Sequence, residues 1–329
     1  MTGDDSPEPV TAVLDTAGAW LPGALGEVEE ALDVATTRTG SLAGDASATL
    51  RAGGKRMRPM LVLLSAGPEG GEAAIRSAVA VELVHMASLV HDDVLDRAPL
   101  RRGRPTVYAE SGRARATDLG DALFAKAFGV LARAGDREAV ELLGRTTRDL
   151  VAGELTQRRQ TGDLALSEEE YFDRCRLKTG SLFSASCVLG GLATANPADR
   201  PALDGLAEFG DAIGLAFQML DDVLDLSGPE ERTGKAPGTD LLDGTVTLPV
   251  VVAIERDPGI GSVDLGGLDR DSALALADRI AATGALDEVR GRAVELVEGA
   301  KASLARTDLP EDRRDLLELV ADGVVLRYS

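Results

Sequence analysis

Residues 72–96 read EAAIRSAVAVELVHMASLVHDDVLD, a long apolar segment that ends in an acidic pentad. Residues 202–227 read ALDGLAEFGDAIGLAFQMLDDVLDLS and carry the same pentad, DDVLD, at 221–225. Apolar residues recur in both segments at helical spacing, so we predict two long helices, each with its pentad near the C-terminal end. We expect further helices roughly at 114–134, 136–161, 167–192 and 284–306, and a loop at 256–269.

The composition favours an all-α fold. Hydrophobic residues make up 44% of the chain but aromatic residues only 3%, so the core must consist mainly of Ala, Leu and Val. Ala and Leu are strong helix formers, whereas the strand-favouring aromatic residues are scarce. No Ser- or Pro-rich linker divides the chain, so we expect a single domain over residues 11–329. Residues 1–10 are polar, acidic and contain proline, and we expect them to be disordered.

The charge and the cysteines limit the partners and the compartment. A formal net charge of -20 argues against a nucleic-acid partner, because phosphate binding needs a basic surface. Cys175 and Cys187 have no metal-like or redox-motif spacing, so a cytoplasmic location is expected. The N-terminus, MTGDDSPEPV, lacks the apolar core of a secretory signal. No apolar run reaches about 18 residues, so we expect no transmembrane segment.

The first pentad points to a metal site. Asp92 and Asp96 are one helical turn apart, so their side chains are neighbours on a helix, and Asp93 adds a third carboxylate. Carboxylates this close repel each other unless a cation neutralises them. Mg²⁺ usually takes one or two carboxylates plus phosphate oxygens. The alternative is a solvated acidic helix end, although the preceding HMASLV looks buried.

The second pentad weakens that alternative. Asp221, Asp222 and Asp225 follow another apolar stretch, AIGLAFQML, and Gln218 precedes them on the same helix face. If the two helices face each other, the pentads form an acidic cage that needs several metal ions. Metal ions in such a cage favour a polyphosphate ligand.

Two clusters of cations stand out in this acidic chain. GGKRMRP occupies residues 53–59, and RAPLRRGRPT occupies residues 97–106, directly after the first pentad. Arginine binds phosphate bidentately and lysine supplies a point charge. Surface charge pairing would explain either cluster alone, but together with the cage they indicate two anionic substrates.

Weaker signals lie elsewhere in the chain. Lys178 and Thr179 stand beside a possible helix irregularity at Gly180, and a Gly-rich loop at 234–249 contains a lysine and an aspartate, Lys235 and Asp240. A solvated lysine and a plain connector are the ordinary explanations. His85 faces the cage and is a candidate phosphate contact, whereas the spacing between His85 and His91 does not suit a zinc site.

In this order, the motifs resemble those of the trans-prenyl diphosphate synthase family, the polyprenyl synthetases. The likeness runs along nearly the whole chain. It includes GGKRMRP, both pentads, RRGRPT, GDALFAKAF at 120–128, AGE at 152–154, KTG at 178–180 and GK..GTD at 234–240. The family implies a bundle of long helices around a central apolar cavity.

The resemblance also implies roles for the matching residues. Three Mg²⁺ ions would hold an allylic diphosphate, ligated by Asp92, Asp96 and Asp221 with Asp225, and supported by Asp93 and Asp222. The allylic diphosphate would also contact Arg101, Lys178, Thr179, Gln218 and Lys235. Isopentenyl diphosphate would contact Lys55, Arg58, His85 and Arg102. The catalytic candidates are Asp92, Asp93, Asp96, Arg101, Lys178, Asp221, Asp222 and Lys235.

The implied reaction is a head-to-tail condensation. The allylic C–O bond ionises when metal ions and cations stabilise the leaving diphosphate. The double bond of isopentenyl diphosphate, held alongside, attacks the allylic cation, and a proton is then lost to the departed diphosphate. An apolar cavity keeps water from the cation. Family members are typically homodimers.

Product length is expected to depend on the helix before the first pentad. Ser88 and Ala87, four and five residues before Asp92, are small, and so is Val84. Short-chain members of the family carry a bulky aromatic residue at one of the first two positions. We therefore expect a product longer than geranylgeranyl diphosphate. The alternative is that Phe124 or Phe128 closes the tunnel, which would give geranylgeranyl diphosphate.

Three positions depart from the family pattern without removing a metal ligand. Thr245 stands where a lysine is common, Ala122 where a larger residue is common, and Gly323 where a tyrosine is frequent.

Other classes of protein fit the sequence less well. A class I terpene cyclase usually lacks the second pentad and the basic site, and the regulatory subunit of a two-component synthase tends to lose aspartates. A plain acidic helical scaffold is the remaining alternative.

Overall fold

The computed structural model of the chain describes residues 9–193, 203–228 and 237–326. These residues are mostly helical, apart from a hairpin in which β1 (Leu100–Arg101) pairs antiparallel with β2 (Arg104–Pro105). The helices before residue 160 are α1 (Pro9–Ala17), α2 (Trp20–Thr37), α3 (Ala43–Arg51), α4 (Met57–Ala66), α5 (Gly71–Leu95), α6 (Val107–Arg133) and α7 (Arg137–Arg159). Those after it are α8 (Glu168–Cys175), the π-helix η3 (Arg176–Gly180), α9 (Ser181–Leu192), α10 (Leu203–Ser227), α12 (Thr239–Leu242), α13 (Leu248–Arg256), α14 (Arg270–Ala282), α15 (Ala285–Leu304) and α16 (Glu311–Leu326).

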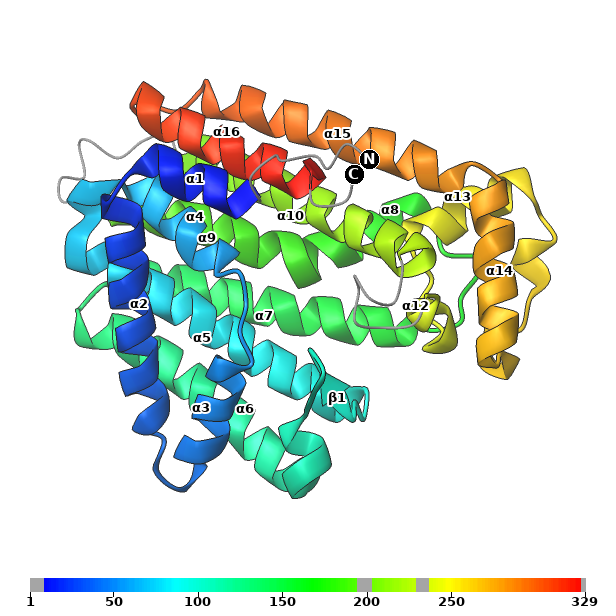
Figure 1. The fold of residues 1–329 in the computed structure, drawn as a ribbon, viewed down its shortest axis with the longest axis horizontal. Coiled ribbons are helices and arrows are strands. Elements are labelled where there is room, and N and C mark those ends of the chain that lie inside the picture. The colour runs from blue at the N-terminus through cyan, green and yellow to red at the C-terminus, as the bar shows by residue number, and fades with distance from the viewer. Residues whose placement is uncertain (1–8, 194–202, 229–236, 327–329) are drawn as a thin grey trace, which may run out of the picture.

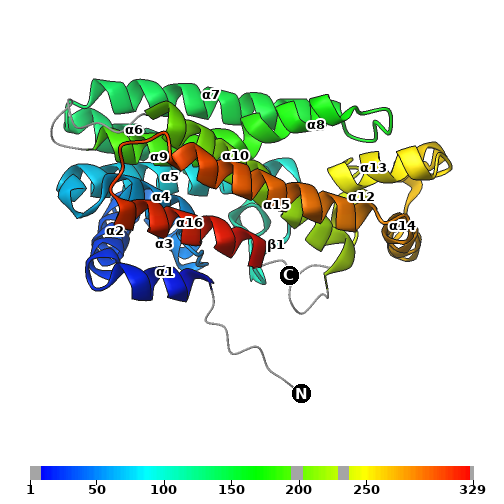
Figure 2. The same ribbon diagram turned by 90° about the horizontal axis from the view of Figure 1, so that it is seen from above.

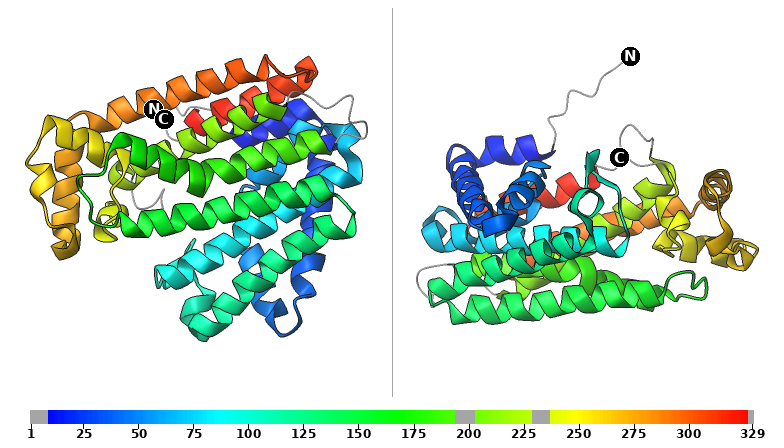
Figure 3. Two further views of the ribbon diagram at one scale, coloured as in Figure 1. Left: turned by 180° about the vertical axis from the view of Figure 1, so that it is seen from behind. Right: turned by 90° about the horizontal axis from the view of Figure 1, so that it is seen from below.

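Long helices from both halves of the chain lie side by side. α5 packs against α2, α4, α6 and α9, and α10 packs against α9 and α15. Figure 1 shows α5, α7, α10 and α15 extending across the molecule, with α2 and α14 crossing at its two ends. Figure 2 places α7 and α8 along one side and α1 along the other, and the view from behind in Figure 3 shows the face that carries α7 and α8.

The middle of the central helix α5 is buried around its whole circumference. Every residue from Ser77 to Val84 is buried, so this helix has no solvent-facing stripe. Of the described helices, the segment Pro68–Leu95 has the length and apolar composition needed to cross a membrane, and 67% of its most apolar window is buried inside this fold. A core helix meets the same test, so the feature is only weak evidence for a membrane span.

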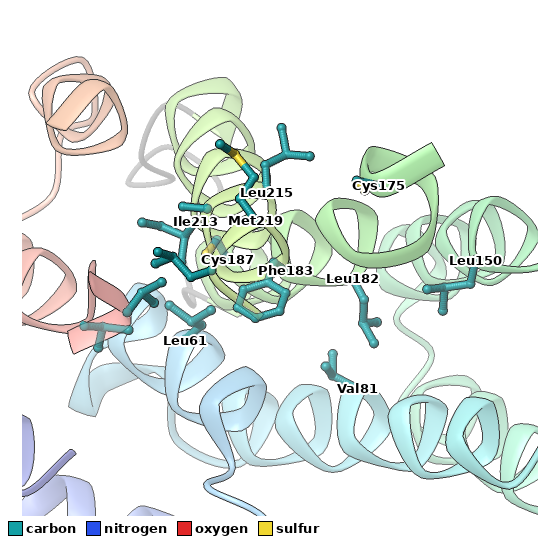
Figure 4. Packing of buried hydrophobic residues seen from close by; sticks show 14 of the residues in the cluster. Leu61, Val81, Leu150, Cys175, Leu182, Phe183, Cys187, Ile213, Leu215 and Met219 are labelled. Atoms are coloured by element: carbon teal, nitrogen blue, oxygen red, sulfur yellow. The ribbon is translucent and has the colours of Figure 1, made fainter. Parts of the chain in front are cut away.

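Glycines let α4, α9 and α10 approach one another closely. A Cβ atom at Gly210 would lie 2.6 Å from the backbone oxygen of Phe183, and one at Gly190 would lie 2.3 Å from the backbone oxygen of Val62. Figure 4 shows Leu61, Phe183 and Ile213 among the buried side chains that fill this region. Because interiors are close-packed, no side chain fits at these glycines without moving a helix.

Most of the predicted helices are confirmed. The predictions at 72–96, 136–161, 202–227 and 284–306 correspond to α5, α7, α10 and α15, with residue 202 outside the described residues. The helix predicted at 114–134 corresponds to the part of α6 after Gly112, whose φ of 81° and ψ of 172° interrupt the helix. A short helical stretch from Val107 precedes this break, and the Thr106 hydroxyl caps it by accepting the N–H of Ala109. The run predicted at 167–192 is α8 and α9 joined by η3. The loop predicted at 256–269 contains two short 3₁₀ turns, η5 (Ile260–Ser262) and η6 (Leu265–Gly267).

The expected disorder of residues 1–10 does not hold for Pro9 and Val10, which begin α1. This helix packs against α16 and buries Val13, so the segment gains apolar contacts that its polar neighbours do not predict. Proline is well tolerated in the first turn of a helix. Residues 1–8 lie outside the described residues.

Replacing Gly210 by alanine should destabilise the protein. The added methyl group would force α10 away from α9, at a cost of about 1–3 kcal/mol in the free energy of unfolding. Gly291→Ala on α15 is the matched control, because a Cβ atom there meets nothing within 4 Å and alanine favours a helix. Thermal unfolding should show a lower Tm for Gly210→Ala and an unchanged or higher Tm for Gly291→Ala. Equal Tm values for Gly210→Ala and the wild type would contradict the close approach.

Candidate active site

The two pentads lie on the walls of one cavity, which we call the acidic pocket. It has a volume of about 630 Å³ and lies between α5, α7, η3, α10 and the segment around α12. Carboxylates from several elements line it: Asp92, Asp96, Glu154, Asp221, Asp222, Asp240 and Asp243. The structure therefore brings together aspartates of both pentads, as the cage predicted from the sequence requires.

Burial makes three of the carboxylates, those of Asp92, Asp96 and Asp222, harder to ionise. Burial, partly opposed by Lys178, raises the pKa of Asp92 to about 6. Burial and repulsion from Asp240 raise the pKa of Asp222 to about 7. Burial and Glu154 also raise the pKa of Asp96 above its usual range. A bound cation would offset both the desolvation and the mutual repulsion of these groups.

The donor chemistry of the acidic pocket fits Mg²⁺. In the part of the chain that the structure describes, no three His, Cys, Asp or Glu side chains stand close enough to hold an ion by themselves. Mg²⁺ usually takes one or two carboxylates and completes its shell with water and phosphate oxygens. Asp92, Asp96 and Asp221 could therefore hold Mg²⁺ together with a polyphosphate.

Asp222 and Asp225 bind protein groups in this structure. The Asp222 carboxylate accepts hydrogen bonds from the Tyr171 hydroxyl at 2.6 Å and from the Gln218 amide at 2.8 Å. Asp225 Oδ2 accepts the backbone N–H of Asp240 at 3.1 Å, and Asp225 is not among the residues that line the acidic pocket. Its carboxylate thus fixes the start of α12, and its role as a metal ligand stays a prediction.

The irregularity suspected at Gly180 is confirmed as the π-helix η3, which brings Lys178 and Thr179 to the acidic pocket. A Cβ atom at Gly153 on α7 would lie 2.5 Å from the backbone nitrogen of Lys178. The close approach of α7 therefore needs a glycine opposite the π turn. Such π turns occur frequently at functional sites.

Lys178 is one of the cations that line the acidic pocket, together with Arg158, whose guanidinium group lies 3.7 Å from Asp96 Oδ1. Lys178 Nζ lies 2.6 Å from Glu154 Oε2 and 3.3 Å from Gln157 Oε1. Burial alone would lower the pKa of Lys178, but Asp92 and Glu154 outweigh burial and raise it. The ammonium group therefore stays charged where a diphosphate would bind.

A second cavity, of about 240 Å³, lies between α3, α5 and the hairpin, and we call it the basic pocket. Its charged and titratable lining consists of four arginines, four carboxylates and one histidine: Arg56, Arg101, Arg102, Arg104, Asp45, Glu82, Asp93, Glu110 and His85. Burial and the guanidinium groups of Arg58 and Arg102 hold the pKa of His85 well below its usual range. The imidazole is therefore neutral, and the positive charge of the basic pocket lies on arginine.

The hairpin that presents these arginines was not predicted from the sequence. Arg102 and Gly103 have φ values of +52° and +72°, as the two central residues of a type I′ turn require. The Arg-Gly pair at 102–103 was the available signal. A left-handed arginine is strained, and such strain is often found at functional sites.

The GGKRMRP motif divides its cations differently from the prediction. Arg56, with a φ of +48°, lines the basic pocket and donates to Glu82 Oε1 at 2.9 Å. Lys55 is exposed and borders a different, small cavity near α1 and α16. Arg58 stacks on Phe183, 4.5 Å from the ring centroid. Sequence reasoning counted Arg56 among the cations of this cluster but assigned it no substrate contact, and it missed Glu82, because a left-handed arginine cannot be read from the motif.

Arg101 borders both pockets. It lines the acidic and the basic pocket, and its Nε donates to Asp93 Oδ1 at 2.6 Å. Asp93 lines the basic pocket, whereas its neighbour Asp92 lines the acidic pocket. Two anions bound in these pockets would therefore be neighbours across the end of α5.

An apolar cavity of about 330 Å³ opens beside the acidic pocket, between α5, α6 and α7. The two cavities share four lining residues: Asp92, Leu95, Glu154 and Lys178. Phe124 lines the apolar cavity, and its ring centroid lies 5.6 Å from that of His91. A chain attached to a diphosphate in the acidic pocket would enter this cavity directly.

The predicted chain-length residues fall in different places. Ser88 and Phe124 line the apolar cavity. Ala87 and Val84 are fully buried on α5, and neither they nor Phe128 are among the residues that line it. Ala87 and Ser88 are adjacent in the sequence but lie on different faces of α5, and only the face of Ser88 borders the apolar cavity.

The remaining predicted contacts are partly described. Thr179 and Gln218 line the acidic pocket, as does Thr245. The backbone N–H of Thr245 donates to the backbone oxygen of Asp240 at 2.8 Å. Lys235 lies outside the described residues.

Comparison with known proteins places the chain among prenyl diphosphate synthases. The Polyprenyl synthetase family model matches residues 41–262. The chain is 39% identical over 300 residues to heptaprenyl diphosphate synthase component 2 of Geobacillus stearothermophilus, covering 88% of this chain and 93% of that protein. It is 34% identical to geranylgeranyl diphosphate synthase of Methanosarcina mazei, covering 84% and 86% of the two chains.

A solved structure gives the same result for the fold. The polyprenyl synthase of Caulobacter crescentus, solved in complex with calcium and isoprenyl diphosphate, superposes with a TM-score of 0.85 at 32% identity. The match covers 97% of this chain and 98% of that one. The all-α fold predicted from the composition is therefore confirmed.

Thr245→Lys should tighten the binding of a polyphosphate modestly, because it adds a cation to the wall of the acidic pocket. We expect roughly a threefold lower Kd for inorganic diphosphate in the presence of Mg²⁺, measured by calorimetry. Thr37→Lys, on the exposed surface of α2, adds the same charge outside the acidic pocket and should leave the Kd unchanged. A higher Kd for Thr245→Lys would show that Thr245 has another role.

Proposed function

This chain belongs to the polyprenyl synthetase family and is a prenyltransferase, and we propose that it joins isopentenyl diphosphate head-to-tail to an allylic diphosphate. One observation carries the proposal. Arg101 borders two pockets that suit two anions, one rich in aspartates and one rich in arginines, and an apolar cavity opens from the aspartate side. The product would be an all-trans polyprenyl diphosphate.

The acidic pocket would bind the allylic diphosphate. Asp92, Asp96 and Asp221 would hold Mg²⁺, three ions by analogy with the family, and the ions would stabilise the negative charge of the leaving diphosphate. Lys178 and Arg101 would add charge-assisted hydrogen bonds as the allylic C–O bond breaks. The calcium and isoprenyl diphosphate found in the Caulobacter crescentus protein support this assignment.

The basic pocket would bind isopentenyl diphosphate. Arg56, Arg101 and Arg102 would bind its phosphate oxygens, and the neutral His85 could donate one further hydrogen bond. This places its double bond beside the allylic carbon across the end of α5. The π electrons form the new C–C bond as the diphosphate leaves, and the resulting cation loses a proton to that diphosphate, which restores a double bond.

The apolar cavity would hold the growing chain. Its side walls come from α5, α6 and α7, and excluding water there protects the allylic cation. Small residues precede the first pentad, so we propose a product longer than geranylgeranyl diphosphate, with geranylgeranyl diphosphate as the alternative if Phe124 closes the cavity. Of the two named relatives, one is component 2 of a heptaprenyl diphosphate synthase and the other is a geranylgeranyl diphosphate synthase.

The assembly is part of the proposal. We propose a homodimer in the cytoplasm, by analogy with the family. A two-component enzyme is the second candidate, because the Geobacillus stearothermophilus relative is named as a second component. Purified protein that is active without any other chain would favour the homodimer.

Activity should require both pentads. Asp92→Asn and Asp221→Asn each remove a carboxylate charge from the acidic pocket, so turnover should fall by roughly a hundredfold or more in each. The measurement is product formation from isopentenyl diphosphate and a panel of allylic diphosphates with Mg²⁺. Asp118→Asn, at an exposed position on α6, is the control and should retain activity. Near-normal turnover in either pentad variant, with unchanged circular dichroism, would exclude the two-pentad mechanism.

Ser88→Phe should shorten the product. An aromatic ring at Ser88 would project into the apolar cavity, whereas Ala87→Phe would overpack a fully buried position and lower the Tm. Chromatographic sizing of the products should show shorter chains for Ser88→Phe than for the wild type. An unchanged distribution would show that the chain grows elsewhere, and a wild-type product of no more than twenty carbons would contradict the proposed length.

A further inference from the structure

A chain of hydrogen bonds crosses the wall of the acidic pocket from α8 to η3. The Tyr171 hydroxyl donates to Asp222 Oδ2 at 2.6 Å, and Gln218 Nε2 donates to Asp222 Oδ1 at 2.8 Å. The Thr179 hydroxyl donates to Gln218 Oε1 at 2.9 Å. Four side chains from α8, α10 and η3 are thus linked in series.

The direction of this chain is fixed by the Asp222 carboxylate. Gln218 turns its NH₂ end to Asp222 Oδ1, an arrangement that suits a carboxylate oxygen acting as acceptor. The amide oxygen of Gln218 is then directed at Thr179, whose hydroxyl must act as a donor. The two ends of the Gln218 amide are therefore distinguished without any ligand.

Tyr171 holds the far end of the chain. Its side chain is fully buried, and its ring meets that of Phe172 edge to face, at 5.3 Å between centroids. The Arg174 guanidinium lies over the Tyr171 ring, 5.3 Å from the centroid. Arg174 in turn donates to the backbone oxygen of Val246 at 2.7 Å. The tyrosine hydroxyl therefore has a fixed position from which to hold one oxygen of Asp222.

We propose that Tyr171 is a positioning residue for the diphosphate end of the acidic pocket. By holding Asp222, it sets the orientation of the Gln218 amide and the Thr179 hydroxyl, both of which line that pocket. Tyr171 itself touches no substrate in this scheme. The ligand named here rests on the proposed function, whereas the hydrogen-bond chain does not.

Tyr171→Phe tests the proposal, because it removes only the hydroxyl. The Kd for inorganic diphosphate with Mg²⁺, measured by calorimetry, should rise by roughly tenfold, as is usual when a supporting hydrogen bond is lost. In steady-state assays, the KM for the allylic diphosphate should rise, while the KM for isopentenyl diphosphate stays unchanged, because Tyr171 has no contact with the basic pocket. Tyr108→Phe, a partly buried tyrosine on α6 outside both pockets, should change neither constant.

A double-mutant cycle separates positioning from general packing effects. Tyr171 and Thr179 are linked only through Asp222 and Gln218 in the hydrogen-bond chain. If Tyr171→Phe and Thr179→Val acted independently, the factors by which they raise the Kd would multiply in the double variant. The proposal requires the Kd of the double variant for diphosphate to be about equal to the higher of the two Kd values of the single variants. Should Tyr171→Phe fail to fold, Asp222→Asn replaces it in the cycle, because Asp222 is the next member of the same hydrogen-bond chain.

The outcomes are distinct from those for the overall function. A wild-type Kd in Tyr171→Phe, multiplicative effects in the cycle, or an equal rise in both KM values would overturn the positioning role while leaving the condensation activity intact. A wild-type protein that binds inorganic diphosphate but forms no product would overturn the condensation and leave the positioning role standing. A wild-type protein that binds no diphosphate would overturn both.

Discussion

The burial of several carboxylates that line one cavity is the constraint on which the rest of this structure depends. Asp92, Asp96 and Asp222 all have a raised pKa, with burial as the leading cause. A fold that holds such groups together must be rigid, because the carboxylates would otherwise move apart or take up protons. α5 and α10 meet this need, since both are long helices whose preceding turns are fixed in the core by contacts with α4, α9 and α15.

Rigidity alone would not place the balancing cation. Lys178 and Thr179 lie on η3, where the helical run from α8 to α9 contains a π turn. A π turn adds one residue to the helix, and each residue turns the chain by about 100°, so an uninterrupted α-helix would direct one of the two segments to a different face. The turn is held between α7 and α10, where Gly153 and Gly214 leave no room for a side chain. The position of the cation thus depends on glycines that never touch the acidic pocket.

These dependencies explain what the sequence could and could not predict. The long helices and both pentads were accessible because apolar periodicity and i, i+4 spacing are local properties. The roles of Arg56 and Tyr171 were not, since they depend on a left-handed backbone in one case and on a partner 51 residues away in the other. The distinction between Ala87 and Ser88 was not accessible from the sequence, for a different reason. A helix that is buried on all sides has no polar face, so its pattern cannot say which residues face a cavity.

The end of α5 shows how one helix can serve two pockets of opposite character. Adjacent residues on a helix point about 100° apart, so Asp92 and Asp93 lie on different faces, one lining the acidic and one the basic pocket. Arg101 spans this division and is held by Asp93 at 2.6 Å. An anion in either pocket would compete with Asp93 for the same guanidinium group, so the charge that Arg101 offers to one pocket depends on what fills the other. Because such coupling is reciprocal for binding free energies, the two substrate sites cannot be electrostatically independent, whichever diphosphate binds first.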